Sequence, residues 1–137
     1  MDGYGKRVLV AEDDDHVRDL LALLLEGTGY NVHTASDGLE ALDELKRRRF
    51  DVVVTDYHMP RLDGLRLLAL SRVVCPDTPV VIISADQSGM AELATQQGAY
   101  AWLRKPYDNA VLLEIVNTAG RQCMKERAQL LTAATAQ

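Results

Sequence analysis

The chain has 137 residues, a formal net charge of −5, 47% hydrophobic residues and 26% charged residues. This length suits one domain with a single core, and the acidic balance argues against a stand-alone nucleic-acid-binding protein, which is usually basic. No apolar run approaches the roughly 20 residues that cross a bilayer, and the start of the sequence lacks the pattern of a secretion signal. Cys75 and Cys123 follow neither a metal-ligand nor a disulfide spacing. We therefore expect reduced thiols in a cytoplasmic protein that does not enter a membrane.

Short apolar runs alternate with segments of helical periodicity along the chain. We expect strands at residues 7–11, 30–35, 51–55, 80–84 and 100–104. We expect helices from Asp14 or Asp15 to about 28, from Ser36 or Asp37 to about 48, and at about 64–74, 88–97 and 108–132. In the first helix the predicted core-facing side chains recur at helical spacing: Val17, Leu20, Leu21, Leu24 and Leu25.

Strands that are separated by helices predict βαβ units and a parallel sheet. The mostly apolar runs at 51–55 and 80–84 indicate strands that are buried on both faces. Right-handed crossovers then give an α/β fold, a doubly wound sandwich of three layers. We expect one domain over residues 1–122, followed at 123–137 by a helical extension or the start of a linker.

Charged side chains stand directly after three of the predicted strands. Glu12 and Asp13 follow the first strand, Asp56 follows the third, and Lys105 follows the fifth. In open α/β sheets the carboxyl ends of the strands form the edge where ligands bind. Because crowded carboxylates need a compensating cation, we expect a divalent metal site with a lysine beside it. Ligands that are all oxygen favour Mg²⁺, with Mn²⁺ as the alternative.

Neighbouring polar residues have simpler interpretations. Asp14 and Asp15 suit the positive N-terminus of the first predicted helix. The basic run at 46–49 is explained by the negative C-terminus of the second predicted helix. Ser84 ends the fourth predicted strand, where its hydroxyl could donate a hydrogen bond to a phosphoryl oxygen.

Four segments together resemble the response-regulator receiver domain of the CheY-like superfamily, the phosphoacceptor module of two-component signalling. They are Val-Leu-Val-Ala-Glu-Asp-Asp at 8–14, Asp-Val-Val-Val-Thr-Asp-Tyr-His-Met-Pro-Arg-Leu-Asp-Gly at 51–64, Pro-Val-Val-Ile-Ile-Ser-Ala at 79–85 and Gly-Ala-Tyr-Ala-Trp-Leu-Arg-Lys-Pro-Tyr-Asp at 98–108. The resemblance spans about residues 6–122. It implies a flavodoxin-like (βα)5 sandwich whose five parallel strands have the order 2-1-3-4-5.

The resemblance also implies a role for individual residues. Asp56 is the expected phosphoacceptor, and the expected magnesium ligands are Glu12, Asp13, Asp56 and the backbone carbonyl of His58. Ser84 and Lys105 are expected to bind the phosphoryl group, and the Lys105–Pro106 bond is expected to be cis. Ser84 and Trp102 are the expected switch residues, although the family usually has Tyr or Phe in place of Trp102. The side chains of His58 and Asp86 are expected to tune the rate of hydrolysis.

The resemblance also implies partners, and two other interpretations of the residues stay open. A receiver domain implies a sensor histidine kinase or a phosphotransfer protein as phosphodonor. It also implies dimerisation or effector docking through the fourth helix, fifth strand and fifth helix, and no direct nucleic-acid binding. Such a domain assists its own phosphorylation and is not otherwise an enzyme. Asp13-Asp14-Asp15 also fits the Asp-x-Asp of a haloacid-dehalogenase-type phosphohydrolase, although that interpretation leaves Asp56 without a role. A pseudo-receiver that only binds a partner is the third hypothesis.

Overall fold

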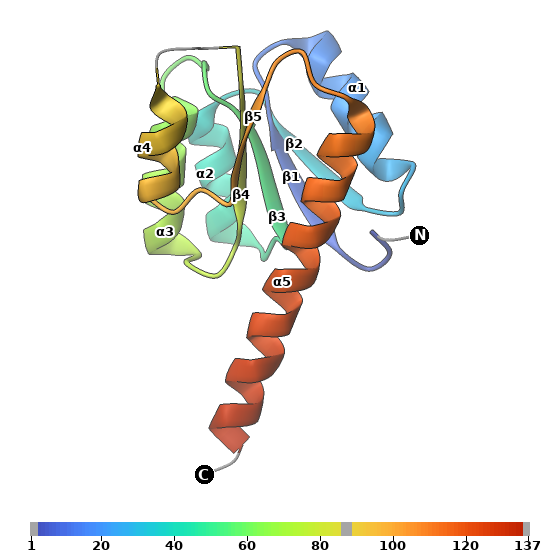
Figure 1. The fold of residues 1–137 in the computed structure, drawn as a ribbon, viewed down its shortest axis with the longest axis vertical. Coiled ribbons are helices and arrows are strands. Elements are labelled where there is room, and N and C mark those ends of the chain that lie inside the picture. Colours follow the sequence, from blue (N-terminus) through green and yellow to red (C-terminus); the bar gives the residue numbers. More distant parts are fainter. Residues whose placement is uncertain (1–2, 86–88, 136–137) are drawn as a thin grey trace.

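The computed structural model describes residues 3–85 and 89–135. Its strands are β1 (Arg7–Ala11), β2 (Asn31–Ala35), β3 (Val52–Asp56), β4 (Val80–Ser84) and β5 (Ala101–Arg104). Its helices are α1 (Asp15–Glu26), α2 (Gly38–Arg47), α3 (Gly64–Val74), α4 (Met90–Gln96) and α5 (Asn109–Thr135). Strands and helices alternate along the chain, as the sequence predicted (Figure 1).

The sheet is parallel throughout and has the strand order β2-β1-β3-β4-β5. The predicted flavodoxin-like topology is therefore confirmed. The register aligns the carboxyl ends of the inner strands, since Ala11 pairs with Thr55 and Asp56 pairs with Ile83. Ser84, the last residue of β4, pairs with Arg104 at the end of β5. Side chains that follow these strands consequently emerge at one edge of the sheet.

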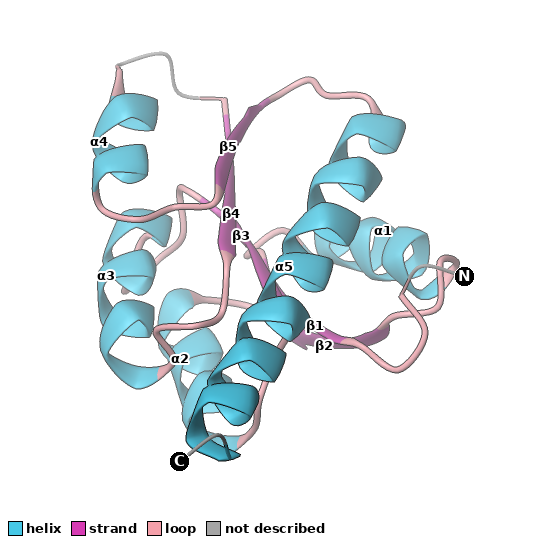
Figure 2. Ribbon diagram, turned by 60° about the horizontal axis from the view of Figure 1, so that its bottom comes forward, coloured by secondary structure: helices cyan, strands magenta, loops and turns pink. Residues whose placement is uncertain are grey.

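Helices cover both faces of the sheet, with α2, α3 and α4 on one side and α1 and α5 on the other (Figure 2). Successive residues of a strand point to opposite faces, so each strand contributes to two separate cores. The core beneath α2, α3 and α4 includes Leu9, Phe50, Val53, Leu67 and Ile82. The core beneath α1 and α5 includes Val8, Val10, Leu25, Val54 and Val116.

Acidic side chains cap α1, α2 and α3 near the carboxyl edge of the sheet. The carboxylate of Asp14 accepts hydrogen bonds from the first free N–H groups of α1. Asp37 and Asp63 cap α2 and α3 in the same way. Each cap satisfies N–H groups that have no partner within the helix. These caps fix the starts of α1, α2 and α3 at this edge of the sheet.

One part of the predicted core is wrong. Leu20 was expected to face the core, but its side chain is 67% exposed, whereas Leu21 and Leu25 are buried. Each residue turns by about 100° around the axis of a helix. With Leu21 and Leu25 facing the sheet, Leu20 lies at the solvent edge of the apolar stripe.

The last helix runs without interruption past residue 122 to Thr135, and it extends beyond the end of the sheet (Figure 1). The division of the chain at residue 122 stays a prediction. The start expected for the fourth helix, at about residue 88, lies outside the described residues, and α4 begins at Met90. Among the described helices, none combines the length and the apolar character that crossing a membrane requires.

Candidate functional site

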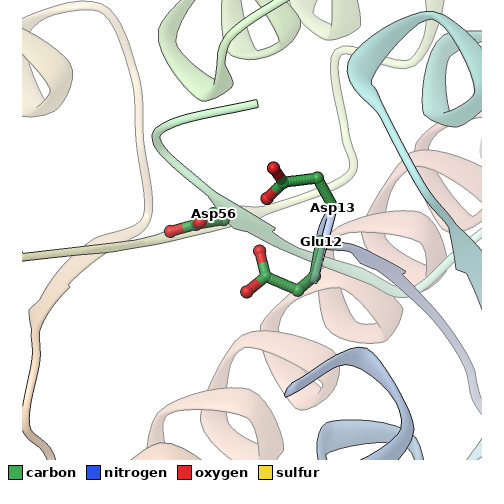
Figure 3. A group of neighbouring side chains, drawn as sticks. All are labelled: Glu12, Asp13 and Asp56. Atoms are coloured by element: carbon green, nitrogen blue, oxygen red, sulfur yellow. The ribbon is translucent and has the colours of Figure 1, made fainter. Parts of the chain in front are cut away.

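Three carboxylates converge at the carboxyl ends of β1 and β3. Glu12 and Asp13 follow β1 directly, and Asp56 is the last residue of β3. Carboxylate oxygens of the three residues lie within 4.8 Å of one another, and Figure 3 shows the side chains grouped together. The N–H of Glu12 donates to a backbone carbonyl at the end of β2 (3.0 Å), and the N–H of Tyr57 donates to a backbone carbonyl of β4 (2.9 Å). These hydrogen bonds fix the grouping. We call Glu12, Asp13 and Asp56 the acidic cluster.

Glu12 is the most buried member of the acidic cluster, with 3% of its surface exposed. Burial, together with the adjacent carboxylate of Asp56, raises the pKa of Glu12 to about 8. Without a cation, Glu12 therefore keeps its proton at neutral pH, because neighbouring carboxylates disfavour each other's ionisation. Its Oε2 atom is buried and has no hydrogen-bond partner among the residues that the structure describes.

The acidic cluster fits a hard divalent cation. A buried oxygen without a partner costs about 1–3 kcal/mol, and a cation beside it would remove this penalty and favour the ionised form of Glu12. The donors are all oxygen, which is the ligand type that Mg²⁺ prefers. The residues that could hold the ion are therefore Glu12, Asp13 and Asp56. The further ligand expected from the sequence, the backbone carbonyl of His58, stays a prediction.

A lysine ammonium group lies beside the acidic cluster. The Nζ atom of Lys105 is 3.3 Å from Oδ1 of Asp56, and the N–H of Tyr57 donates to the same oxygen (3.0 Å). The backbone N–H of Lys105 donates to the carbonyl of Ser84 (2.9 Å), and the peptide bond between Lys105 and Pro106 is cis, as predicted. Ser84 is completely buried at the end of β4. The structure thus brings the residues predicted from β3, β4 and β5 to one edge.

Contacts between aromatic rings connect β5 with the loop that follows Asp56. Trp102 is partly buried and packs against the core beneath α2, α3 and α4. Its ring meets the ring of Tyr57 edge-on, with centroids 5.4 Å apart, and Tyr57 meets His58 at 4.6 Å. No sequence pattern indicated the central position of Tyr57. Asp86, which was predicted to tune hydrolysis, lies outside the described residues.

Arg18 supports the loop between β1 and α1, and sequence reasoning missed it. Its guanidinium group donates to the backbone carbonyl of Glu12 (2.9 Å) and pairs with Asp15 (2.5 Å). The side chain is 16% exposed, so the group lies close against the protein. Arg18 therefore fixes the backbone of the residue that supplies the most buried carboxylate. A basic residue in the first turns of a helix is too common to have been singled out.

A second ion pair joins two loops at the same edge of the sheet. The guanidinium group of Arg61, in the loop between β3 and α3, binds the carboxylate of Asp37 at the start of α2. Arg61 has φ +68°, in the left-handed region that residues other than glycine rarely adopt. Gly38 lies so close to Leu62 that a Cβ atom would be 2.2 Å from the Leu62 carbonyl oxygen. The loop that carries His58 is thus held against α2.

Removing this ion pair should change the titration of Asp37. The N–H of Glu40 and the guanidinium group of Arg61 together hold the pKa of Asp37 below its ordinary value of 3.8. A depressed pKa in the folded state stabilises the fold above the unfolded value, and the stabilisation is lost as the pH falls through the folded value. We expect Arg61→Ala to raise the pKa of Asp37 towards 3.8, as measured by carboxyl ¹³C NMR. Arg66→Ala is the control and should leave it unchanged; an unaltered Asp37 titration in Arg61→Ala would contradict the prediction.

Comparison with known proteins identifies one family over most of the chain. Residues 8–117 match the model of the response regulator receiver domain. The chain is 39% identical over 116 residues to the transcriptional regulatory protein GlrR of Escherichia coli K12, a match that covers 84% of this chain and 26% of that protein. The chain thus spans less than half the length of the first curated relatives that it matches.

Solved structures of receiver domains also match this chain, over nearly their whole length. A response regulator receiver domain protein of Clostridium thermocellum is 32% identical, with a TM-score of 0.81, and the match covers 92% of this chain and 98% of that one. The receiver domain of the sensor histidine kinase PA1611 of Pseudomonas aeruginosa is 27% identical, with a TM-score of 0.77, and the match covers 85% and 98%. That structure is described with a magnesium ion coordinated in the active site cleft.

Proposed function

Because the chain belongs to the response regulator receiver domain family, we propose that it is a phosphorylation switch whose phosphoacceptor is Asp56. The observation that carries the proposal is the position of Asp56, within 4.8 Å of the other carboxylates of the acidic cluster and with its Oδ1 3.3 Å from Lys105 Nζ. The phosphodonor would be a sensor histidine kinase or a phosphotransfer protein in the cytoplasm. In this proposal the domain assists its own phosphorylation and dephosphorylation and has no separate substrate.

The proposed reaction is a nucleophilic displacement at phosphorus. A carboxylate oxygen of Asp56 attacks the phosphorus of a phosphohistidine, the P–N bond breaks, and its electron pair returns to the imidazole nitrogen. The product is an aspartyl phosphate. The ammonium group of Lys105 binds one phosphoryl oxygen, and the hydroxyl of Ser84 donates to another. Mg²⁺, when held by the acidic cluster and the carbonyl of His58, would neutralise charge on the transferring oxygens.

The electrostatics of the acidic cluster and Lys105 support this proposal. Phosphoryl transfer to Asp56 brings an anion towards the acidic cluster, and only Lys105 is within 4.0 Å of Asp56 as a counter-charge among the described residues. A second positive charge is needed to offset this repulsion. The magnesium ion in the PA1611 receiver domain supports Mg²⁺ as that charge in this chain, and Mn²⁺ is the alternative.

Phosphorylation by a small phosphodonor tests the proposal. Incubation with acetyl phosphate and Mg²⁺ should give one adduct with a mass gain of about 80 Da, the mass of a phosphoryl group on a carboxylate. Chelation of Mg²⁺ by EDTA should suppress the adduct. Reduction with borohydride should then convert the phosphorylated aspartate into homoserine, which peptide mass spectrometry would locate at position 56. The absence of any adduct would support a pseudo-receiver, and rapid turnover of phosphoesters would support a phosphohydrolase.

We further propose that phosphorylation shifts the surface formed by α4, β5 and α5 between two arrangements. In this proposal Ser84 moves towards the phosphoryl group and Trp102 responds to that movement, which biases an equilibrium that already exists. The contact of Trp102 with Tyr57, the residue after Asp56, supports this coupling. A homodimer or an effector would use this surface. His58 and Asp86 would tune the lifetime of the phosphorylated form.

The fluorescence of Trp102 should report this shift, because the chain contains one tryptophan. We expect acetyl phosphate and Mg²⁺ to change the intensity or emission maximum, as the ring alters its contact with Tyr57. The change should be absent in Asp56→Asn and should reverse as the phosphoryl group hydrolyses. Emission that stays constant while the mass adduct forms would separate Trp102 from the switch and leave the phosphorylation chemistry intact.

A further inference from the structure

A groove of about 590 Å³ lies at the end of the sheet opposite the acidic cluster. One wall consists of the last turn of α2 and the residues that follow it, and the other consists of the connection between α3 and β4. The lining residues are Leu45 to Arg49 and Val74 to Thr78. This volume is within the range of ordinary ligand sites, and the groove shares no residue with the proposed phosphorylation site.

Contacts with the core fix both walls of the groove. The hydroxyl of Thr78 donates to the backbone carbonyl of Phe50 across the groove's base (3.1 Å), and the N–H of Thr78 donates to the carbonyl of Cys75 (3.0 Å). Phe50, Leu45 and Thr78 are all buried. The walls are therefore held in place before a partner binds, which lowers the entropic cost of binding.

The groove carries an excess of positive charge on a chain whose net charge is −5. Lys46, Arg47 and Arg49 are exposed, and none has a carboxylate within 4.0 Å in the part of the chain that the structure describes. Arg48 pairs with Glu44 (3.2 Å), and Asp77 is the acidic side chain of the lining. The negative end of a helix corresponds to about half an elementary charge. The dipole of α2 therefore accounts for only part of this cluster.

The groove combines cations with backbone acceptors and an apolar strip. It contains the C-terminal ends of α2 and α3, whose last carbonyls have no N–H partner within their helices. Val74 is 36% exposed, the neighbouring Val73 is 81% exposed, and Cys75 is half-buried. Inorganic phosphate would bring negative charge but no apolar surface towards two negative helix ends. A peptide with acidic and aliphatic side chains would bring carboxylates, N–H donors and apolar surface.

A second hollow of about 420 Å³ continues along the same edge. It shares Pro76 and Asp77 with the first and is also lined by Arg72, whose guanidinium group donates to the carbonyl of Pro76 (2.9 Å). An extended segment that follows the first groove can therefore continue into the second. From these observations we infer that the edge between α2 and α3 docks an extended, acidic segment of a partner protein that carries aliphatic side chains. This surface shares no residue with the proposed phosphorylation site, so one partner protein could bind at both places at once.

Binding of a designed probe tests the inference. The probe is a fluorescein-labelled peptide of Glu-Glu-Leu repeats, and the comparison ligands are a Glu-Glu-Ser peptide of equal length and inorganic tripolyphosphate. We expect the leucine peptide to bind most tightly, as measured by fluorescence anisotropy, and to shift the amide NMR signals of residues 45–49 and 74–78. The double variant Arg47→Glu, Arg49→Glu should weaken binding by about tenfold or more.

Arg66→Glu is the matched control, because Arg66 is an exposed residue at the opposite end of α3. It should leave binding within about twofold of the wild type, since a distant surface charge is largely screened. Formation of the acetyl phosphate adduct in each variant checks that the domain is folded. Equal binding of all three ligands, NMR shifts elsewhere, or undiminished binding by the double variant would each overturn the inference.

Discussion

Asp56→Asn should abolish formation of the phosphoryl adduct while the domain stays folded. The amide of asparagine has no anionic oxygen to attack phosphorus, and the other carboxylates of the acidic cluster come from a different strand end. Asp56 also supplies one of the three groups within 4.8 Å that could hold the cation. The variant should therefore bind Mg²⁺ more weakly. Intact mass spectrometry after incubation with acetyl phosphate measures the first effect.

The second effect of Asp56→Asn is visible in urea unfolding with and without Mg²⁺. A ligand at 100 times its Kd stabilises the folded state by about 2.7 kcal/mol, and the variant should gain less than the wild type at the same concentration. Without Mg²⁺ the substitution removes a charge from a crowded group of carboxylates, so it should cost little stability. Asp77→Asn, at the far end of the sheet, should keep both the adduct and the Mg²⁺ effect. An adduct that forms in Asp56→Asn would assign the phosphoacceptor elsewhere.

The strand ends could be read from the sequence because the sheet is parallel and its inner strands are buried on both faces. Residues 52–54 and 80–83 are apolar, so the polar residues that follow them, Thr55-Asp56 and Ser84, mark the edge of the sheet. In a parallel sheet these ends share one edge, and therefore the positions of Asp56 and Ser84 followed directly. Leu20 was misassigned because the apolar run in α1 is wider than the stripe that the sheet covers.

Contacts between loops could not be read in the same way. Arg61 and Asp37 are 24 residues apart and belong to different loops, so no periodicity relates them. The left-handed conformation of Arg61 and the support that Arg18 gives to Glu12 depend on the folded path of the chain. The raised pKa of Glu12 depends on its burial beside Asp56. Sequence patterns identify which groups reach the edge, whereas their spacing and protonation follow from packing.

Gly64→Ala should destabilise the domain and disturb the site together. Gly64 begins α3, and its N–H donates to the carbonyl of Tyr57 (2.8 Å), which closes the loop after Asp56. A Cβ atom on Gly64 would lie 2.5 Å from the carbonyl oxygen of Asp56 and 3.0 Å from the Cα of Tyr57. These atoms belong to the backbone, so a side-chain rotation cannot relieve the clash. Either α3 or the end of β3 must move, at a cost of about 3 kcal/mol.

The two results of Gly64→Ala are measured separately. Urea unfolding gives the loss of stability, and the rate of adduct formation with acetyl phosphate and Mg²⁺ under conditions where the variant is folded gives the effect on Asp56. Gly27→Ala is the control, because Gly27 has an ordinary helical conformation and its Cβ would meet only the carbonyl oxygens of Leu23 and Leu24 at 3.4 Å. It should change stability by less than about 1 kcal/mol. Gly64→Ala could instead change stability and the rate of adduct formation no more than Gly27→Ala does. The close approach of α3 to β3 would then not position Asp56 towards Lys105 and the other carboxylates.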